Sequence, residues 1–272
     1  MDLNQKLLLK NEAKSNVIVK LKDWDPDMDL GKSKKDSESE IGGIFNQLAE
    51  LQYKLFAENK RSLLIILQGM DTSGKDGTIR NVMKALNPQS CYVKSFKVPS
   101  EEEHSHDYLW RVHKSIPPKG HIAIFNRSHY EDVIGVSVDG FSCKSELDLK
   151  YRQINEFERY LFENQVIVLK LFLHISKDEQ EKRLKARLNN STKHWKVSES
   201  DFVSHRNWNK HIEAYEDALR LCNTEWAPWY IIPSNVKHFR NWAVAQLVVN
   251  ALENMKPKFP EPKLDFSKLV FD

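Results

Sequence analysis

Along this chain, short apolar runs alternate with longer segments in which apolar residues recur every three or four positions. The short runs are rich in Leu, Ile, Val and aromatic residues, which is typical of buried strands. We expect strands at residues 63–67, 91–97, 121–126, 165–175 and 229–233. The periodic segments predict helices at residues 43–59, 76–86, 101–115, 146–163, 177–190, 201–222 and 235–255. Strands that alternate with helices indicate a three-layer α/β/α fold around a parallel sheet.

The two ends of the chain lack this pattern. Residues 1–40 are polar and mixed in charge, and we expect an extended, partly mobile N-terminal arm. No long polar linker interrupts the rest, so residues 41–272 are expected to form one domain. Within it, loops are predicted at 135–144 and 191–200. The proline-rich tail from Lys256 predicts an irregular surface strap.

Composition is that of an ordinary globular protein, with 272 residues, 40% hydrophobic and 29% charged. The formal net charge of +3 is too small for a protein that coats nucleic acid, so any polyanion must meet a local basic patch. Three cysteines without metal-type spacing indicate a reducing compartment. The N-terminus has no apolar signal core, and the run at 166–175 is too short to span a bilayer. We expect a cytoplasmic protein that binds neither nucleic acid nor membrane.

The first apolar run leads directly into a glycine loop. Gly69 is followed five positions later by Gly74 and then Lys75, after which a helical pattern begins. Such a loop turns backbone amides toward an anion, and the helix N-terminus adds the positive end of its dipole. Lys75 adds a mobile cation. Phosphates are therefore expected to bind at Lys75 and along Gly69, Thr72, Ser73, Gly74, Asp76 and Gly77.

Two aspartates distinguish this loop from the usual phosphate-binding motif. The residue after the lysine is normally Ser or Thr, whose hydroxyl reaches a magnesium ion, and here it is Asp76. Asp71 lies among the phosphate-binding amides, where a carboxylate is costly unless a metal ion separates it from the phosphates. We therefore expect Asp71 to help bind Mg²⁺, or Mn²⁺ in its place. A glycine-containing turn in some other α/β protein is the alternative interpretation.

Further candidate side chains follow the strand predicted at 121–126. Asn126, Arg127 and Glu131 come at its carboxyl end, where open α/β sheets bind their ligands. An arginine can donate two hydrogen bonds to phosphate oxygens, and a carboxylate can hold magnesium or its waters. A local ion pair between Arg127 and Glu131 is the alternative. His129 is expected to be a packed or hydrogen-bonded side chain, not a base or a ligand.

The helix predicted at 177–190 carries a run of basic residues. Arg183 and Arg187 are four positions apart and therefore share one face, as the arginines of a lid over a chain of phosphates would. Lys193 follows this helix, and Lys94 lies in the second predicted strand, where it could extend the positive crevice. The alternative is an ordinary solvated, charged surface.

These features together favour phosphoryl transfer, which depends on positioning and on charge neutralisation. One alternative is an ATP-dependent kinase that acts on nucleotides or small metabolites. A second is a protein that binds nucleotides or polyanions without turnover. A guanine-nucleotide switch fits less well, because Asn209-Lys210 is not followed by the aspartate that guanine recognition needs.

Five sequence blocks closely resemble the family-2 polyphosphate kinases. They are QGMDTSGKDGTI (68–79), SFKVPSEEEHSHDYLWR (95–111), FNRSHYEDV (125–133), VLKLFLHISKDEQEKRL (168–184) and APWYIIP (227–233). The resemblance implies a nucleotide-kinase-like P-loop fold with a helical lid, at about residues 178–205. It also implies a polyphosphate kinase, which moves a phosphoryl group reversibly between inorganic polyphosphate and a nucleotide with Mg²⁺. A homo-oligomer, either a dimer or a tetramer, is a further implication.

The resemblance also implies roles for single residues. Asp71, Lys75, Asn126 and Arg127 would form the catalytic centre, and Asp71 would help to hold magnesium. Arg183 and Arg187 would belong to the lid over the polyphosphate.

The same resemblance bears on the nucleotide. A subclass that acts on nucleoside diphosphates tends to have Asp at 126, Trp at 129 and Asn at 131. With Asn126, His129 and Glu131, this sequence is more similar to the subclass that accepts both mono- and diphosphates. ADP, AMP and ATP are the expected nucleotides, and guanine nucleotides are further candidates.

Overall fold

The computed structural model describes residues 3–10, 18–140 and 143–264, together with residues 266 and 269. Parts of the predicted arm, of the loop at 135–144 and of the tail lie outside these residues. They are residues 1–2, 11–17, 141–142, 265, 267–268 and 270–272.

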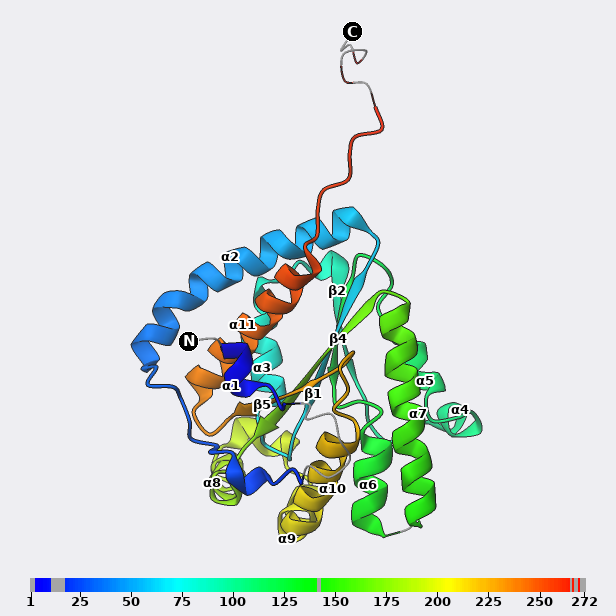
Figure 1. The fold of residues 1–272 in the computed structure, drawn as a ribbon. Coiled ribbons are helices and arrows are strands. Elements are labelled where there is room, and N and C mark those ends of the chain that lie inside the picture. Colours follow the sequence, from blue (N-terminus) through cyan, green and yellow to red (C-terminus); the bar gives the residue numbers. More distant parts are fainter. Residues whose placement is uncertain (1–2, 11–17, 141–142, 265, 267–268, 270–272) are drawn as a thin grey trace.

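A five-stranded parallel sheet forms the centre of the molecule (Figure 1). Its strands are β1 (Ser62–Gln68), β2 (Cys91–Ser95), β3 (Ile122–Asn126), β4 (Val166–His174) and β5 (Trp229–Pro233). They lie in the order β2-β3-β1-β4-β5, and every neighbouring pair is parallel. Because β1 is central, the glycine loop that follows it lies between the carboxyl ends of β3 and β4.

Helices cover both faces of the sheet (Figure 1). One face packs against α2 (Lys34–Glu58), α3 (Lys75–Val82) and α11 (Lys237–Met255). The other packs against α6 (Glu131–Asp139), α7 (Lys144–Glu163) and α10 (Trp208–Leu221). Successive residues of β1 enter these two cores alternately, as the period-2 geometry of a strand requires. The predicted three-layer α/β/α fold with a parallel sheet is confirmed.

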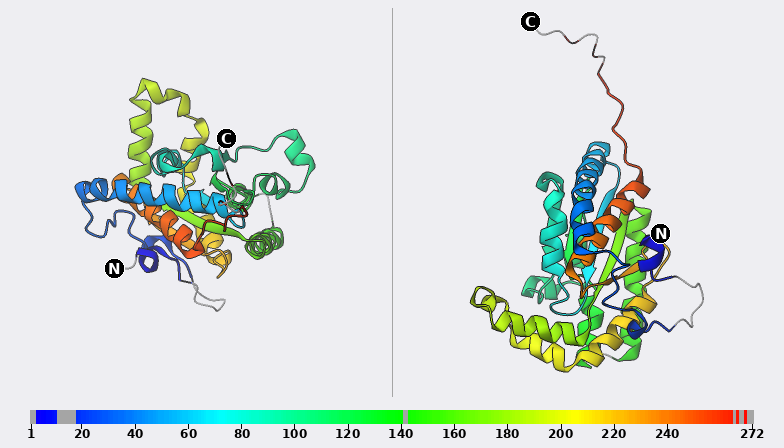
Figure 2. Two further views of the ribbon diagram at one scale, coloured as in Figure 1. Left: turned by 90° about the horizontal axis from the view of Figure 1, so that it is seen from above. Right: turned by 90° about the vertical axis from the view of Figure 1, so that its left-hand side faces the viewer.

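A helical projection leaves the body next to the glycine loop. It consists of α8 (Lys177–Leu188), the 3₁₀ helix η4 (Ser191–Lys196) and α9 (Glu199–Arg206). Figure 2 shows α8 and α9 running side by side away from the sheet. These elements span nearly all of the segment predicted as a lid at 178–205, and its closure over a substrate stays a prediction.

Several predicted boundaries were wrong, each for a local reason. Residues 135–139 belong to α6 instead of a loop, because Val133, Ile134 and Val138 are buried beneath α10. The predicted loop at 191–200 is largely helical, and the helix predicted at 201–222 is divided at Asn207 into α9 and α10. The helix predicted at 101–115 is two short ones, α4 (Glu101–Ser105) and α5 (Trp110–His113).

The remaining elements are short. They are α1 (Leu3–Leu7), η1 (Leu21–Asp23), η2 (Met83–Ala85) and η3 (Pro88–Ser90). The first packs against β5 and α11 through the buried Leu3 and Leu7, and after it Leu9 donates its backbone N–H to Trp229 O at 2.9 Å. The helix expected to start at residue 43 begins at Lys34, where Ser33 and Asp36 form a capping box. It therefore runs across residue 40, and the division into an arm and a domain at that position stays a prediction.

None of the helices in the described ranges combines the length and the hydropathy needed to cross a lipid bilayer.

Candidate active site

The loop after β1 has the backbone of an anion-binding turn. Gly69 and Gly74 have φ angles of +148° and +110°, which side chains disfavour. A Cβ at Gly69 would lie 2.6 Å from Leu173 O, and one at Gly74 would overlap the Arg240 guanidinium. Thr72 has a φ of +66°, a strained conformation for a β-branched residue. Strain of this kind persists where the surrounding structure enforces it, and it is concentrated at functional sites.

Some polar groups of this loop have no hydrogen-bond partner among the described residues. Within the described part of the chain, no side chain caps the first turn of α3. Its leading amides therefore remain available to a ligand. The buried hydroxyls of Thr72 and Ser73 likewise have no hydrogen-bond partner among the described residues. An anion at the start of α3 would meet a dipole and unpaired N–H groups together.

Lys75 is buried beneath this loop. Its Nζ donates to Gly69 O at 2.7 Å and to Met70 O at 3.2 Å, so the ammonium closes the loop from one side. Burial and, to a smaller extent, the nearby Arg127 charge lower the pKa of Lys75 to about 8, although Asp71 opposes the shift. A bound phosphate would place negative charge beside the buried Lys75 ammonium and so stabilise its charged form.

Arg127 connects the end of β3 to the loop. Its Nη2 donates to Asp71 Oδ1 at 2.5 Å, and its Nη1 donates to Glu131 Oε2 at 3.2 Å. Burial alone would raise the pKa of Asp71, but the charges of Lys75 and Arg127 outweigh burial and lower it. The local pair of Arg127 with Glu131 does form, and the guanidinium also reaches across 56 positions to Asp71.

Asn126 is held against Asp76, the residue that replaces the usual Ser or Thr. Its Nδ2 donates to Asp76 Oδ1 at 2.9 Å, while Lys196 Nζ of η4 donates to Asp76 Oδ2 at 2.8 Å. The hydrogen bond from Lys196 is the main reason that the pKa of Asp76 is lowered. The carboxylate therefore joins the loop, the end of β3 and the helical projection.

The two predicted lid arginines have different surroundings. Arg183 is largely buried. It donates to four backbone carbonyls, two in the glycine loop and two just after β5. They are Thr72 O at 2.9 Å, Ser73 O at 3.0 Å, Ser234 O at 2.6 Å and Asn235 O at 3.1 Å. Arg187 lies one turn further along α8 and donates to Asp201 Oδ2 of α9 at 3.0 Å. Arg183 thus supports the loop directly, whereas Arg187 ties α8 to α9.

Two predicted lysines lie away from this cluster. Lys94 is on the edge strand β2, with its Nζ 5.7 Å from the centroid of the Phe96 ring. Lys193 is exposed on η4. Among the described residues, neither lysine forms a hydrogen bond or an ion pair with the loop.

The family model for polyphosphate kinase 2 matches residues 31–260. This chain belongs to the polyphosphate kinase 2 family. It is 45% identical over 254 residues to the AMP/ADP-polyphosphate phosphotransferase of Meiothermus ruber, covering 93% of this chain and 95% of that protein. It is 39% identical over 227 residues to the ADP-polyphosphate phosphotransferase of Rhodopseudomonas palustris, covering 79% and 78%. The resemblance inferred from the five sequence blocks is confirmed.

A solved structure agrees with this membership. The crystal structure of polyphosphate kinase 2 from Arthrobacter aurescens matches with a TM-score of 0.90 at 39% sequence identity. The match covers 97% of this chain and 94% of that one. The fold of this chain is therefore that of a solved polyphosphate kinase 2 over 97% of its length.

The donor set of this polyphosphate kinase 2 member is compatible with a magnesium ion shared with substrate. Among the described residues, no group of three or more His, Cys, Asp or Glu side chains is placed to hold a metal. Magnesium in nucleotide sites needs only one or two carboxylates and takes its other ligands from waters and phosphates. Asp71 is an ionised carboxylate at the loop, so it fits this need. The buried, unpartnered hydroxyl of Thr72 beside it is one more oxygen at the same place.

Three polar residues that approach this centre from α9 and α10 were not predicted from the sequence. A hydrogen bond from Ser204 contributes to the lowered pKa of Asp71. Burial lowers the pKa of His211, which interacts electrostatically with Asp71 and Arg127. Tyr215 is buried, interacts with the charge of Arg127 and hydrogen-bonds to the backbone of Gly69. Only the tertiary fold brings these helices to the loop.

A fourth residue that sequence reasoning missed is Arg240 of α11. It is 3% exposed, packs on Gly74 and donates to Ser73 O at 3.3 Å. Burial, with Arg183 nearby, lowers the pKa of Arg240 to about 10. A usable signal was present here, because Ala243 and Val244, three and four positions after Arg240 and therefore on the same helical face, are apolar.

Proposed function

We propose that this chain is a polyphosphate:nucleotide phosphotransferase. A terminal phosphate oxygen of the nucleotide attacks the terminal phosphorus of inorganic polyphosphate. One phosphoanhydride bond forms as another breaks, and the polyphosphate leaves one phosphate shorter. ADP becomes ATP and AMP becomes ADP, and the reaction is reversible because the bond formed is of the same kind as the bond broken.

The observation that carries this proposal is the convergence of Lys75 and Arg127 on Asp71 at the mouth of the loop. Phosphoryl transfer spreads negative charge over the oxygens of the transferred group, and fixed positive charges stabilise it. Here two cations, Lys75 at the start of α3 and Arg127 just after β3, are held in place before substrate arrives. Asp71 would hold the Mg²⁺, or Mn²⁺ in its place, which neutralises phosphate charge when bound.

We assign residues around this centre to the two substrates, the acceptor nucleotide and the polyphosphate. Asn126 and Glu131 border the same centre, and we propose that they contact the acceptor nucleotide. The exposed Lys193 and the partly exposed Arg187 stand on the helical projection, and we propose that they meet the polyphosphate. The contacts of Arg183 support a role in holding the loop carbonyls, so that the loop amides face the phosphates.

The proposal extends to the setting of the enzyme. All three cysteines are free, which supports a cytoplasmic location. A homo-oligomer, dimer or tetramer, is proposed from family membership, and light scattering of the purified protein would measure it.

The test is formation of ATP from ADP and polyphosphate in the presence of Mg²⁺, with products separated by chromatography. AMP, GMP and GDP complete the acceptor panel, because this chain has Asn126 and Glu131 at positions linked to acceptor choice. Increasing salt is expected to raise the KM for polyphosphate strongly, by the counterion-release effect seen with nucleic acids. Absence of any nucleotide product from polyphosphate would overturn the proposal.

Two controls separate the alternatives. The variant Lys75→Ala is expected to lose turnover. Lys185→Ala on the exposed face of α8 is expected to keep it, since Lys185 forms a solvent-exposed ion pair with Glu181. ATP with nucleosides or small metabolites as acceptors tests the ATP-dependent kinase. A faster rate with ATP as donor than with polyphosphate of any chain length would favour that alternative.

A further inference from the structure

A fully buried polar cluster lies behind the loop that carries Arg127. Glu158 of α7, Lys170 of β4, His129 and Tyr130 are each 0% exposed. Lys170 Nζ donates to Glu158 Oε2 at 2.7 Å and to Tyr130 Oη at 2.9 Å. Tyr130 Oη donates to Glu158 Oε1 at 2.8 Å, and His129 Nε2 lies 3.3 Å from the same oxygen. His129 is thus hydrogen-bonded within the protein, as expected from the sequence.

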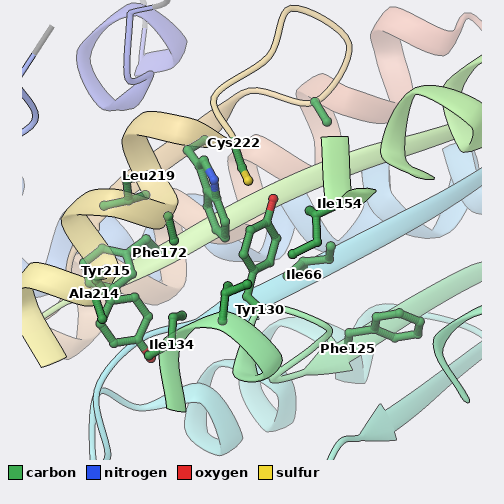
Figure 3. Packing of buried hydrophobic residues seen from close by; sticks show 14 of the residues in the cluster. Ile66, Phe125, Tyr130, Ile134, Ile154, Phe172, Ala214, Tyr215, Leu219 and Cys222 are labelled. Atoms are coloured by element: carbon green, nitrogen blue, oxygen red, sulfur yellow. The ribbon is translucent and has the colours of Figure 1, made fainter. Parts of the chain in front are cut away.

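This cluster is embedded in the apolar core. Figure 3 shows the Tyr130 hydroxyl directed toward Cys222, with Ile154 and Ile66 beside the ring. Lys170 Nζ donates to Cys222 O at 2.6 Å and lies 4.9 Å from the centroid of the Trp229 ring. Burial would raise the pKa of Glu158, but Lys170 and His129 outweigh burial and lower it, which favours the carboxylate form.

An ion pair in such a place is a poor source of stability. Removing two charges from water costs several kcal/mol for each ion, and well-packed apolar residues in their place are often as stable or more stable. Lys170 also interrupts the apolar run from Val166 to Leu173, and its neighbours on the same face are Val168 and Phe172. A role in geometry explains the cluster better than a role in stability.

The segment next to the cluster needs an external constraint. Arg127 has a φ of +64°, which costs energy for a side chain other than glycine and persists only where neighbours enforce it. Its backbone N–H donates to Leu67 O at 3.1 Å, which fixes the start of the segment. Tyr130 N donates to Ser128 Oγ at 3.2 Å. This hydrogen bond couples the position of Tyr130 to Ser128, the residue directly after Arg127.

Gln68 adds a second link to the same segment. With its amide oriented to satisfy all neighbours, it accepts from Ser128 Oγ at 3.0 Å and donates to Glu131 Oε1 at 3.1 Å. The segment from Arg127 to Glu131 is therefore fixed by β1 on one side and by the buried cluster on the other.

We propose that Glu158 and Lys170 are positioning residues, which act through Tyr130 and His129 to hold Arg127 in the geometry that phosphoryl transfer requires. The proposal rests on the proposed function for its kinetic test. Neither residue touches substrate, since both are fully buried. A displacement of about 1 Å in a positioned catalytic group can cost about a hundredfold in rate.

The kinetic test compares Tyr130→Phe and Glu158→Gln with two matched variants of exposed residues on α7, Tyr160→Phe and Glu156→Gln. Both cluster variants are expected to lower kcat by about 10- to 100-fold, with the KM for nucleotide changed by less than about threefold. The matched variants are expected to retain the wild-type kcat. A kcat unchanged in both cluster variants would overturn the proposal.

A double-mutant cycle distinguishes positioning from general weakening. In an Arg127→Lys background, where the two-pronged guanidinium is already lost, Tyr130→Phe is expected to lower kcat by no more than about a further twofold. A loss equal to that in the wild-type background would show that the cluster acts independently of Arg127 and would overturn the proposal.

Hydrogen exchange supplies a measurement that does not depend on turnover. Amides of residues 126–131 are expected to exchange faster in Tyr130→Phe than in wild type, while those of α11 on the opposite face of the sheet stay unchanged. Equal exchange in residues 126–131, or a uniform acceleration throughout the chain, would overturn the proposal even if no polyphosphate activity were found.

Discussion

Arg127 and Asp71 form an ion pair at 2.5 Å that joins the carboxyl end of β3 to the loop after β1. The pair explains why a carboxylate, Asp71, can lie at a phosphate-binding loop. Asp71 compensates Arg127 and Lys75 while the site holds no phosphate, and it keeps the guanidinium directed at the loop. An incoming phosphate then meets cations that need no rearrangement, which is how preorganised sites stabilise developing charge.

The charge of Asp71 is therefore expected to matter for turnover. Asp71→Asn keeps the shape but removes the negative charge that orients Arg127 and that suits a magnesium ion. We expect kcat to fall by about a hundredfold or more, together with a higher Mg²⁺ concentration at half-maximal rate. Steady-state rates over a magnesium titration measure both. Asp217→Asn, at an exposed ion pair with Arg220, is the control, and an unchanged magnesium dependence of Asp71→Asn would remove Asp71 from metal binding.

Lys75 is expected to produce an alkaline limit to activity. Its pKa is lowered to about 8, so the free enzyme loses this charge as pH rises through that value. The ratio kcat/KM reports the free enzyme and should fall about tenfold per pH unit above the pKa. Lys75→Arg stays charged and should flatten this limb, while Lys75→Ala should lose roughly a thousandfold or more in turnover. A wild-type profile that stays level to pH 9.5 would contradict the assignment.

The central part of this site could be predicted because it depends on local sequence and on one rule of topology. A glycine loop after a strand predicts the anion site, and parallel strands bring Asn126 and Arg127 to the same edge of the sheet. The structure places both beside the loop, through Asp76 and Asp71. Nothing in the spacing of residues required the positive φ of Arg127, which is enforced by neighbours distant in sequence.

Other features depended on tertiary contacts that no single segment encodes. Residues 135–139 contain Gly135 and Ser137 and therefore resembled a loop, but burial under α10 makes them helical. Arg183 was expected to face phosphate because of its helical spacing with Arg187. Its position instead depends on the carbonyls of Ser234 and Asn235, which follow a strand 50 residues away in sequence.

Arg183 and Arg187 are expected to differ in their effects when replaced. Arg183→Ala would remove the side-chain donor of Thr72 O, Ser234 O and Asn235 O, whereas Ser73 O would keep Arg240. A buried carbonyl left unpaired costs about 1–3 kcal/mol. The free energy of unfolding should fall by about 2–4 kcal/mol, and the KM values for nucleotide and polyphosphate should both rise. Arg187→Ala, one turn away, should raise mainly the KM for polyphosphate. Urea unfolding and two substrate titrations separate these effects, and equal stability of the two variants would contradict them.

Folding stability is expected to decrease in mild acid partly because of His174. This side chain ends β4 and donates its Nε2–H to Trp24 O at 3.0 Å, and burial lowers its pKa. The unfolded chain therefore binds a proton at His174 more readily than the folded chain does. The contribution of His174 to folding stability is complete above its unfolded pKa of about 6.5, and it is lost as pH falls through the lower folded pKa. His174→Gln retains a donor but does not titrate, and it should lose less stability than wild type between pH 7.5 and pH 5.5 in urea unfolding. His106→Gln, at an exposed position, should behave like wild type. Parallel pH profiles for wild type and His174→Gln would show that another group causes the loss.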